Sequence, residues 1–498
     1  MNKDINEDMV KYKSFMKLSL SFGFLFMFAF YDMFLNFNGI FYPVFVAGLF
    51  ILSVLGLRKL DIGLDRSRYL SSGLSYIIMA ILLGISSNLT SNEFIIFFNT
   101  ILIIILYGVF ITKCLFPKKE LDLFKMIGFF INMIFLNLGN IHLPFKHIKI
   151  EAKDKNINTS KIKQIIEGVI FALLFLIVVI PLLMSSDLIF ANLFNNIGFN
   201  FKKIFNNCFV YLFLLISGTC IFYSLFSVLA KKKDYNLENN LVKTQPIRMI
   251  TMTWFITAIY LLYSSIQIIY LIGGNFFTLP DNLTYAEYAR SGFFQLLAVA
   301  FINLSLVLLC VKKVKEDRWL DISLRVISGC TFIMIASATY RMILYINVYY
   351  LTFIRVLVLW FLLVLTICMI GIVYYIHNKS FYIYRFLFVT SIISYLIFGF
   401  IKPDYIIAKY NISHMETIKI EDMNYILDLS LDAVPALENI TEEQYIFQDN
   451  ESTSTSDSKS KKALESKLKD IINNHNNRIR YFNISRWRAY KTSKYMLK

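Results

Sequence analysis

Long apolar runs separated by short polar loops are the dominant pattern along this chain. A membrane-spanning helix needs about 20 mostly apolar residues, and eleven runs come close to that length. The predicted spans are 16–36, 39–57, 70–87, 93–112, 164–185, 207–230, 249–272, 292–311, 320–346, 350–376 and 382–400. The pattern therefore predicts an all-α protein in which residues 16–400 form a polytopic transmembrane helical bundle of about eleven spans.

One further apolar run, 124–145, is interrupted by three asparagines and Pro144. If this run crossed the membrane, the following segment KHIKIEAKDKNINTSKIK, with its six lysines, would lie outside and every later loop would invert. Lys and Arg accumulate in cytoplasmic loops. We therefore interpret 124–145 as an interfacial or re-entrant helix on the cytoplasmic side.

The charges of the loops then follow one rule along the whole chain. With the N-terminus, 1–15, in the cytoplasm, the outer loops carry only Lys202, Lys203 and Arg290. The inner loops carry Arg58, Lys59, Arg66, Arg68, Lys113, Lys118, Lys119, Lys231, Lys232, Lys233, Lys243, Arg248, Lys312, Lys313, Lys315, Arg318, Lys379 and Arg385. This asymmetry predicts that the N-terminus lies inside and the C-terminus outside.

The chain becomes polar after Phe400. Residues 401–448 carry helix and turn signals and are predicted to form a small extramembrane helical segment. The low-complexity stretch DNESTSTSDSKSKK predicts a flexible linker over 449–462. Residues 463–498 are predicted to form a basic amphipathic C-terminal helix.

Composition agrees with a membrane protein and argues against other classes. Hydrophobic residues make up 57% of the chain and charged residues 17%, against about 25% charged in soluble domains. A net charge of +16 would suggest nucleic acid as a partner of a soluble protein. Here the cations of the inner loops account for it, so we expect the lipid bilayer and no nucleic acid as a partner.

The residue types that carry catalysis or bind metals form no recognisable motif. The six cysteines include no C-x-x-C pair, and the five histidines include no H-E-x-x-H. A phosphate-binding G-x-x-x-x-G-K-[ST] loop is also absent from the sequence. We therefore expect no cofactor and no metal, assign no catalytic residue, and do not favour an enzyme.

Ionisable residues in or beside spans are the best functional indicators in a membrane protein. The predicted topology brings six of them to one outer level: Asp32, Asp187, Glu287, Arg290, Arg341 and Arg355. Within a span, an unpaired Arg341 would cost about 3 kcal/mol. This outer-face network is either a site in which Arg341 and Arg355 face a small anionic ligand or a protein partner, or an ion-pair network that holds helices together.

Asp428 and Asp432 lie in the acidic segment DLSLDAVPAL. Such residues are usually helix caps or dipole partners. The alternatives are a partner for the basic terminal helix or a weak cation site. The basic aromatic run RIRYFNISRWRAYK near the end is expected either to dock on anionic headgroups or to pack against 402–440.

Several strings together resemble a bacterial family of multi-pass membrane proteins catalogued as domain of unknown function 4173, related to family 4153. They are SSDLIFANL, LTYAEYARSGFFQLLAVAFIN, YRMILYINVYYLTFIR, KPDYIIAKYNI, YILDLSLDAVPAL and FNISRWRA, and they span about 185–490. The resemblance implies a bacterial cytoplasmic membrane location and no established activity. It adds Asp404 to the candidate residues of the C-terminal segment. The chain departs from the family at Tyr350, where a glycine is usual before Leu-Thr.

The sequence favours a membrane signalling or scaffold component with a polar outer-face site. A secondary transporter is the alternative, although transporters usually show internal repeats and broken helices. A membrane-embedded transferase is a third hypothesis and has the least support. Such enzymes commonly place acidic residues on a long first outer loop, and the predicted first outer loop of this chain is short.

The topology makes a direct prediction for intact cells. A cysteine placed at Ser456 should react with a membrane-impermeant thiol reagent, because the C-terminal region lies outside. A cysteine placed at Asn240, in a predicted inner loop, should not react until the membrane is permeabilised. The reverse labelling would contradict the predicted orientation.

Overall fold

A computed structural model describes most of the chain, and its regular elements are helices. The described residues are 2–30, 39–59, 66–115, 123–147, 210–229, 245–272, 293–441, 456–475 and 482–498, with a few single positions between them. Within these ranges the element order contains helices alone. The prediction of an all-α fold is confirmed.

Eight helices of the described residues are long and apolar enough to cross a membrane. They are α2 (Phe41–Lys59), α4 (Glu93–Leu115), the segment Val210–Leu229, α9 (Ile247–Ile272), α11 (Phe293–Lys313), α12 (Arg318–Tyr349), α13 (Phe353–His377) and α14 (Ile383–Ile401). The chain is therefore an integral membrane protein with a helical bundle.

Three further helices contain shorter apolar stretches: α1 (Asn2–Phe30), α3 (Arg66–Leu89) and α5 (Leu123–Gly139). Helices α1 and α3 coincide with predicted spans, and α5 coincides with the ambiguous run 124–145. Predicted span 164–185 lies outside the described residues. Helix α1 begins at Asn2 instead of residue 16, because the polar N-terminus contains no Gly or Pro to stop it.

The chain divides into two compact units. The first comprises Met1–Phe37, Phe41–Ile81 and Leu102–Asn236. Its helices pack through aromatic rings: Phe22 of α1 stacks on Phe222, with ring centroids 4.6 Å apart. A buried hydrogen bond of 2.9 Å joins the hydroxyl groups of Ser53 and Tyr107.

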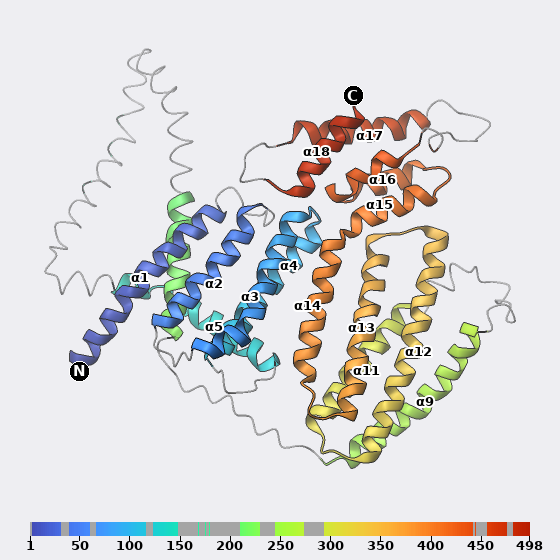
Figure 1. The fold of residues 1–498 in the computed structure, drawn as a ribbon, viewed down its shortest axis with the longest axis horizontal. Coiled ribbons are helices and arrows are strands. Elements are labelled where there is room, and N and C mark those ends of the chain that lie inside the picture. The colour runs from blue at the N-terminus through green and yellow to red at the C-terminus, as the bar shows by residue number, and fades with distance from the viewer. Residues whose placement is uncertain are drawn as a thin grey trace. The chain divides into compact units, whose positions relative to one another are not determined.

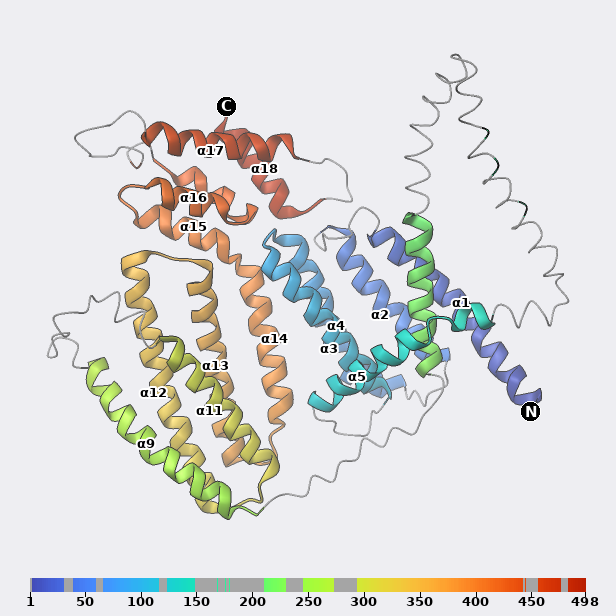
Figure 2. The ribbon, with the colours of Figure 1, turned by 180° about the vertical axis from the view of Figure 1, so that it is seen from behind.

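The second unit comprises Asn38–Ile40, Leu82–Ile101 and Leu237–Lys498. Its membrane part contains α9 and α11–α14, and α12 packs against α9, α11 and α13 (Figures 1 and 2). A continuous apolar core joins these helices. Helices α13 and α14 approach closely because Gly371 leaves room for the ring of Phe386.

A polar seam runs between α9, α11 and α12. Its members are Thr253, Tyr260 and Gln267 of α9, Asn303 of α11, and Ser323, Thr331, Ser337 and Arg341 of α12. Thr253 bonds Ser323 at 2.8 Å, Tyr260 donates to Asn303 at 2.7 Å, and Ser337 donates to Gln267 at 2.7 Å. The opposite face of α9 exposes large apolar side chains such as Phe255 and Ile259, as a lipid-facing helix does.

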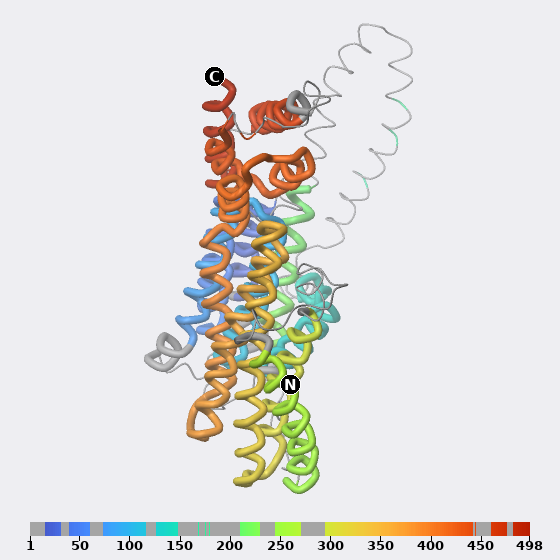
Figure 3. The backbone as a smooth tube through the Cα atoms, turned by 90° about the vertical axis from the view of Figure 1, so that its right-hand side faces the viewer, coloured from blue at the N-terminus to red at the C-terminus, as the bar shows by residue number. Residues whose placement is uncertain are grey.

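The described residues of 403–498 form a helical structure that we call the cap. It contains α15 (Pro403–His414), α16 (Ile420–Asp428), the 3₁₀ helix η1 (Leu431–Asn439), α17 (Ser456–Asn473) and α18 (Ile484–Met496). These elements gather at one end of the second unit's membrane helices (Figure 3). They share an apolar core of their own, which includes Ile412, Met423, Leu437, Leu468 and Ala489.

The C-terminal part differs from the sequence expectation in two places. Helix α17 begins at Ser456, inside the stretch expected to be a linker, because Lys and Ala there are good helix formers. The expected single helix over 463–498 is two helices. Asparagines 473 and 474 weaken the first, and Asn483 caps the second by accepting hydrogen bonds from the amides of Ser485 and Arg486.

The turn between α12 and α13 contains a backbone conformation that normally requires glycine. Tyr350 has φ 58° and ψ −174°, a region that is essentially restricted to glycine and costs other residues about 1–3 kcal/mol. The resemblance described above implies a glycine at this position, and Tyr350 adopts a backbone conformation to which glycine is suited.

We expect Tyr350→Gly to be more stable than Tyr350→Ala by about 1 kcal/mol or more, because both lose the ring but only glycine relieves the backbone. Thermal unfolding of the purified chain measures the difference. Lys409→Gly and Lys409→Ala, within α15, serve as the matched pair. There the alanine variant should be the more stable by about 1 kcal/mol. An alanine at 350 as stable as the glycine would contradict the assignment of strain.

Candidate functional site

The turn between α3 and α4 is one of two turns of the membrane helices that the cap binds. It consists of Thr90, Ser91 and Asn92 and lies in the second unit. Asn92 caps α4, because its side-chain oxygen accepts a hydrogen bond of 3.1 Å from the amide of Ile95. The backbone amide of Asn92 donates to the hydroxyl of Thr90 at 3.1 Å. The turn is thus a rigid, polar structure with buried Thr90 and Asn92 side chains.

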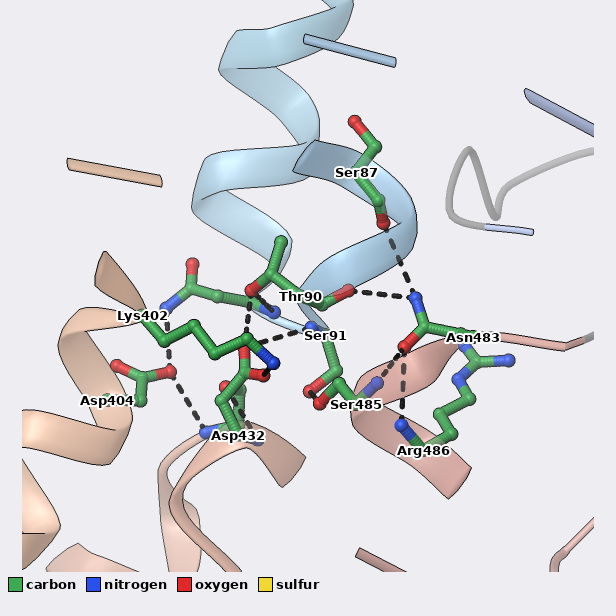
Figure 4. A network of polar contacts seen from close by, with 11 residues as sticks. Ser87, Thr90, Ser91, Lys402, Asp404, Asp432, Asn483, Ser485 and Arg486 are labelled. Carbon is green, nitrogen blue, oxygen red and sulfur yellow. Dashed lines mark hydrogen bonds and ion pairs between the residues drawn. The ribbon is translucent and has the colours of Figure 1, made fainter. Parts of the chain in front are cut away.

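Asp432 of η1 binds this turn directly (Figure 4). Its Oδ2 accepts hydrogen bonds from the hydroxyl of Thr90 and, at 3.1 Å, from the amide of Ser91. Its Oδ1 lies 3.3 Å from the ammonium group of Lys402. The side chain of Asp432 is 1% exposed, so the charge is stabilised by these partners and by the amino end of α4, where the helix dipole favours an anion.

Asp404 of α15 lies beside Asp432 in the same network. Its Oδ2 accepts from the side-chain amide of Asn92 at 2.8 Å and from the backbone amide of Ser430 at 3.3 Å. Its Oδ1 has no hydrogen-bond partner among the described residues. Burial raises the pKa of the Asp404 carboxyl. The hydrogen bonds from Asn92 and Ser430 oppose this rise because they favour the charged form, whereas the neighbouring carboxylate of Asp432 adds to it.

Lys402 is placed by the corner between α14 and α15. Its backbone is left-handed, with φ 58° and ψ 75°, and Pro403 starts the next helix. This corner ends the membrane helix and turns the chain into the cap. The Lys402 side chain thereby provides the only described cation within salt-bridge distance of Asp432.

Asn483 ties the C-terminal helix to the same turn. Its side-chain amide donates to the carbonyl of Thr90 at 2.9 Å and to that of Ser87 at 3.4 Å. Asn88 donates to the carbonyl of Phe482 at 2.9 Å, and the hydroxyls of Ser91 and Ser485 are 3.0 Å apart. The carbonyls of Ser87, in the last turn of α3, and of Thr90, in the turn that follows, are thus satisfied by Asn483, the N-cap of α18.

The cap also holds the turn between α12 and α13. The side-chain amide of Asn411 pairs with both the amide and the carbonyl of Leu351, at 2.9 Å each. The hydroxyl of Tyr425 accepts from the amide of Phe353 at 2.9 Å. From the bundle side, Arg355 donates to the carbonyls of Tyr349 and Tyr350. Two separate turns of the second unit's membrane helices are therefore bonded to one cap.

The two groups of sequence-predicted residues have different outcomes. Asp32, Asp187, Glu287 and Arg290 lie outside the described residues, so the outer-face network stays a prediction. Arg341 is buried and donates to Gln267 at 3.4 Å within the polar seam. Arg355 packs over the ring of Tyr345 and supports the α12–α13 turn. These two arginines are not joined to each other by any described hydrogen bond.

In the C-terminal segment, the fold brings Asp404 and Asp432 together and leaves Asp428 exposed at the end of α16. Asp432 lies in the first turn of η1, and its carboxylate accepts hydrogen bonds from the turn before α4. Among the described residues, no group of three or more His, Cys, Asp or Glu is placed to hold a metal ion, and the weak cation site stays a hypothesis.

Sequence reasoning missed Thr90, Asn92, Lys402 and Asn483. The sequence did carry local signals for two of them. Asn92 directly precedes an apolar run, as N-cap residues do, and Lys402-Pro403 marks a helix boundary. No local signal connects position 90 to position 432, because that contact depends on the tertiary fold.

The raised pKa of Asp404 predicts a dependence of stability on pH. Above the ordinary value of 3.8, the unfolded chain loses this proton while the folded chain keeps it, so stability falls as the pH rises toward the folded-state pKa. Asp404→Asn should make the decline in melting temperature shallower. Part of the decline should remain in this variant, because burial also raises the pKa of Asp422. Asp428→Asn, at an exposed position, should show the same dependence of melting temperature on pH as the wild type. The same dependence in Asp404→Asn would contradict the prediction.

Comparison with known proteins adds a family and nothing more specific. The comparisons with curated proteins and with solved structures found no match. A family model described as Domain of unknown function (DUF4153) matches residues 77–440. That range includes both turns and the cap as far as η1, and thus both buried carboxyl groups. Of the two related families that the sequence strings indicated, it is the second whose model matches, and the chain belongs to the DUF4153 family.

Proposed function

We propose that this protein is a membrane signalling or scaffold component in which the cap is the interacting part. In this proposal the network around Asp432 couples the cap to the membrane helices. The supporting observation is that buried and partly buried hydrogen bonds join the cap to the α3–α4 turn and to the α12–α13 turn. A movement of either helix pair would be transmitted to the cap through these bonds.

The charge distribution of the second unit supports an outer position for the cap. The loops with Lys312, Lys313 and Arg318, and with Lys379, lie at the end of the helices opposite to the cap (Figure 1). Cationic loops favour the cytoplasmic side. A signal or partner on the outer side would then meet the cap, and the helices would carry its effect across the membrane.

A secondary transporter remains the second candidate, because the polar seam gives it a specific observation. Asn303 donates to Thr331 at 2.9 Å and accepts from Tyr260, deep between three membrane helices. A transporter would use such groups to bind a polar substrate near the middle of the bilayer. The seam's hydrogen bonds are also what interhelical packing in lipid requires, and for this reason we rank the transporter second.

A strain that lacks the chain, complemented with single variants, separates these functions. Asp432→Asn leaves the partly buried Lys402 without its counter-charge, which costs about 3 kcal/mol of cap attachment. If the cap transmits a signal, this variant should reach the membrane at wild-type levels but fail to restore the strain's transcript profile. Asp428→Asn, the same change at an exposed site four residues away, should restore it.

The seam variant Asn303→Leu provides the opposing test. Under the signalling proposal it should restore the transcript profile, provided that its membrane level and melting temperature show a folded chain. Restoration by Asp432→Asn together with failure of a folded Asn303→Leu would contradict the proposal and favour transport.

A further inference from the structure

Helix α18 presents a basic and aromatic face that its own cap does not cover. Its buried residues are small: Ser485, Ala489, Thr492 and Ser493. They recur every three to four residues and pack toward η1. The opposite arc carries Trp487, Arg488, Lys491, Lys494 and Tyr495, all of them exposed.

This arc is uniform in charge and contains large exposed rings. Helix α18 includes no acidic residue. Trp487 is 44% exposed and Tyr495 is 74% exposed. The ammonium of Lys491 lies 5.5 Å from the centre of the Trp487 ring, so cation and ring form one surface. A partner must therefore be anionic, and it must accept an indole ring.

The start of α18 is fixed at the end of the membrane helices. Asn483 and Phe482 bond to Ser87, Asn88 and Thr90, the last residues of α3 and the following turn. From there α18 runs away from the membrane helices toward the C-terminus (Figure 3). At 1.5 Å per residue, Trp487 and Arg488 stand roughly 6–8 Å beyond this anchor, and Lys491 about 12 Å.

These heights match the polar layer of a bilayer. The headgroup region adds about 5–8 Å on each side of the hydrocarbon core, and the potential of an anionic surface extends roughly 8–10 Å farther. With the α3–α4 turn at the edge of the hydrocarbon core, this rise would place Trp487 and Arg488 at headgroup level and Lys491 within the field of the surface. Tryptophan is enriched at this level because its ring is amphipathic.

We propose that the first turns of α18, with Trp487, Arg488 and Lys491, bind anionic phospholipid headgroups of the membrane that holds the chain. An acidic protein segment would satisfy the same charges. The anchored height favours the lipid, because the bilayer is already present at the level of Trp487. The inference requires the cap to stand at the membrane surface but does not depend on a signalling role, so the two proposals fail independently.

Reconstitution of the full chain in lipid nanodiscs tests this proposal. With Trp254, Trp319 and Trp360 replaced by Phe, Trp487 is the single tryptophan and reports its own lipid neighbours. Brominated phosphatidylglycerol should quench its fluorescence more than equally brominated phosphatidylcholine does. The local enrichment of the anionic lipid should fall roughly five-fold with Arg488→Gln and vanish with Arg488→Gln/Lys491→Gln or in high salt.

Matched variants and a second measurement make the result decisive. Lys461→Gln/Lys462→Gln removes the same charge from exposed positions of α17 and should leave the enrichment unchanged. If the tryptophan replacements unfold the chain, native mass spectrometry of Arg488→Gln/Lys491→Gln should show fewer retained phosphatidylglycerol molecules than wild type. Equal quenching by the two lipids would overturn the proposal. The proposal would also be overturned if polyglutamate shifted the Trp487 emission in neutral nanodiscs while anionic lipid had no effect on it. The α18 face would then bind acidic protein instead of lipid.

Discussion

The buried charge of Asp432 is the constraint around which the second unit is organised. A carboxylate removed from water must be given hydrogen bonds and a counter-charge, or its burial costs several kcal/mol. Here the turn before α4 supplies the hydrogen bonds and Lys402 supplies the counter-charge. Because these groups belong to three different parts of the chain, satisfying one carboxylate sets the positions of α4, α14 and η1 together.

Asp404 extends this constraint to a second buried carboxyl group. Burial raises its pKa, and the hydrogen bonds from Asn92 and from the backbone of Ser430 offset part of that rise. A raised pKa means that burial disfavours the charged form of this group. The partners that the α3–α4 turn supplies to both carboxyl groups therefore limit the cost of burying them together.

The membrane helices and the cap are held together by different forces. In lipid, apolar surfaces gain little by association, and polar groups must find partners within the protein. The seam around Asn303 and Gln267 accordingly joins α9 and α11 to α12 by hydrogen bonds. The cap has an apolar core instead, and its two halves have opposite charges. Residues 403–457 contain twelve acidic and two basic residues, whereas 458–498 contain two acidic and twelve basic residues. Packing of α16 against α17, and of η1 against α18, brings these halves together.

The sequence by itself determined the class of the protein and the positions of most membrane helices, because apolar runs of span length are a local property. It also marked Asp404 and Asp432, through resemblance and composition, but as caps or ion sites near their own helices. Only the tertiary structure decided that both carboxyls meet the α3–α4 turn, more than 300 residues earlier in the chain. It also decided that the terminal segment is two helices, one of which is capped by Asn483 at that same turn. The physical reason is that a buried polar group is stabilised by whichever partners the fold brings to it, and no local pattern specifies those partners.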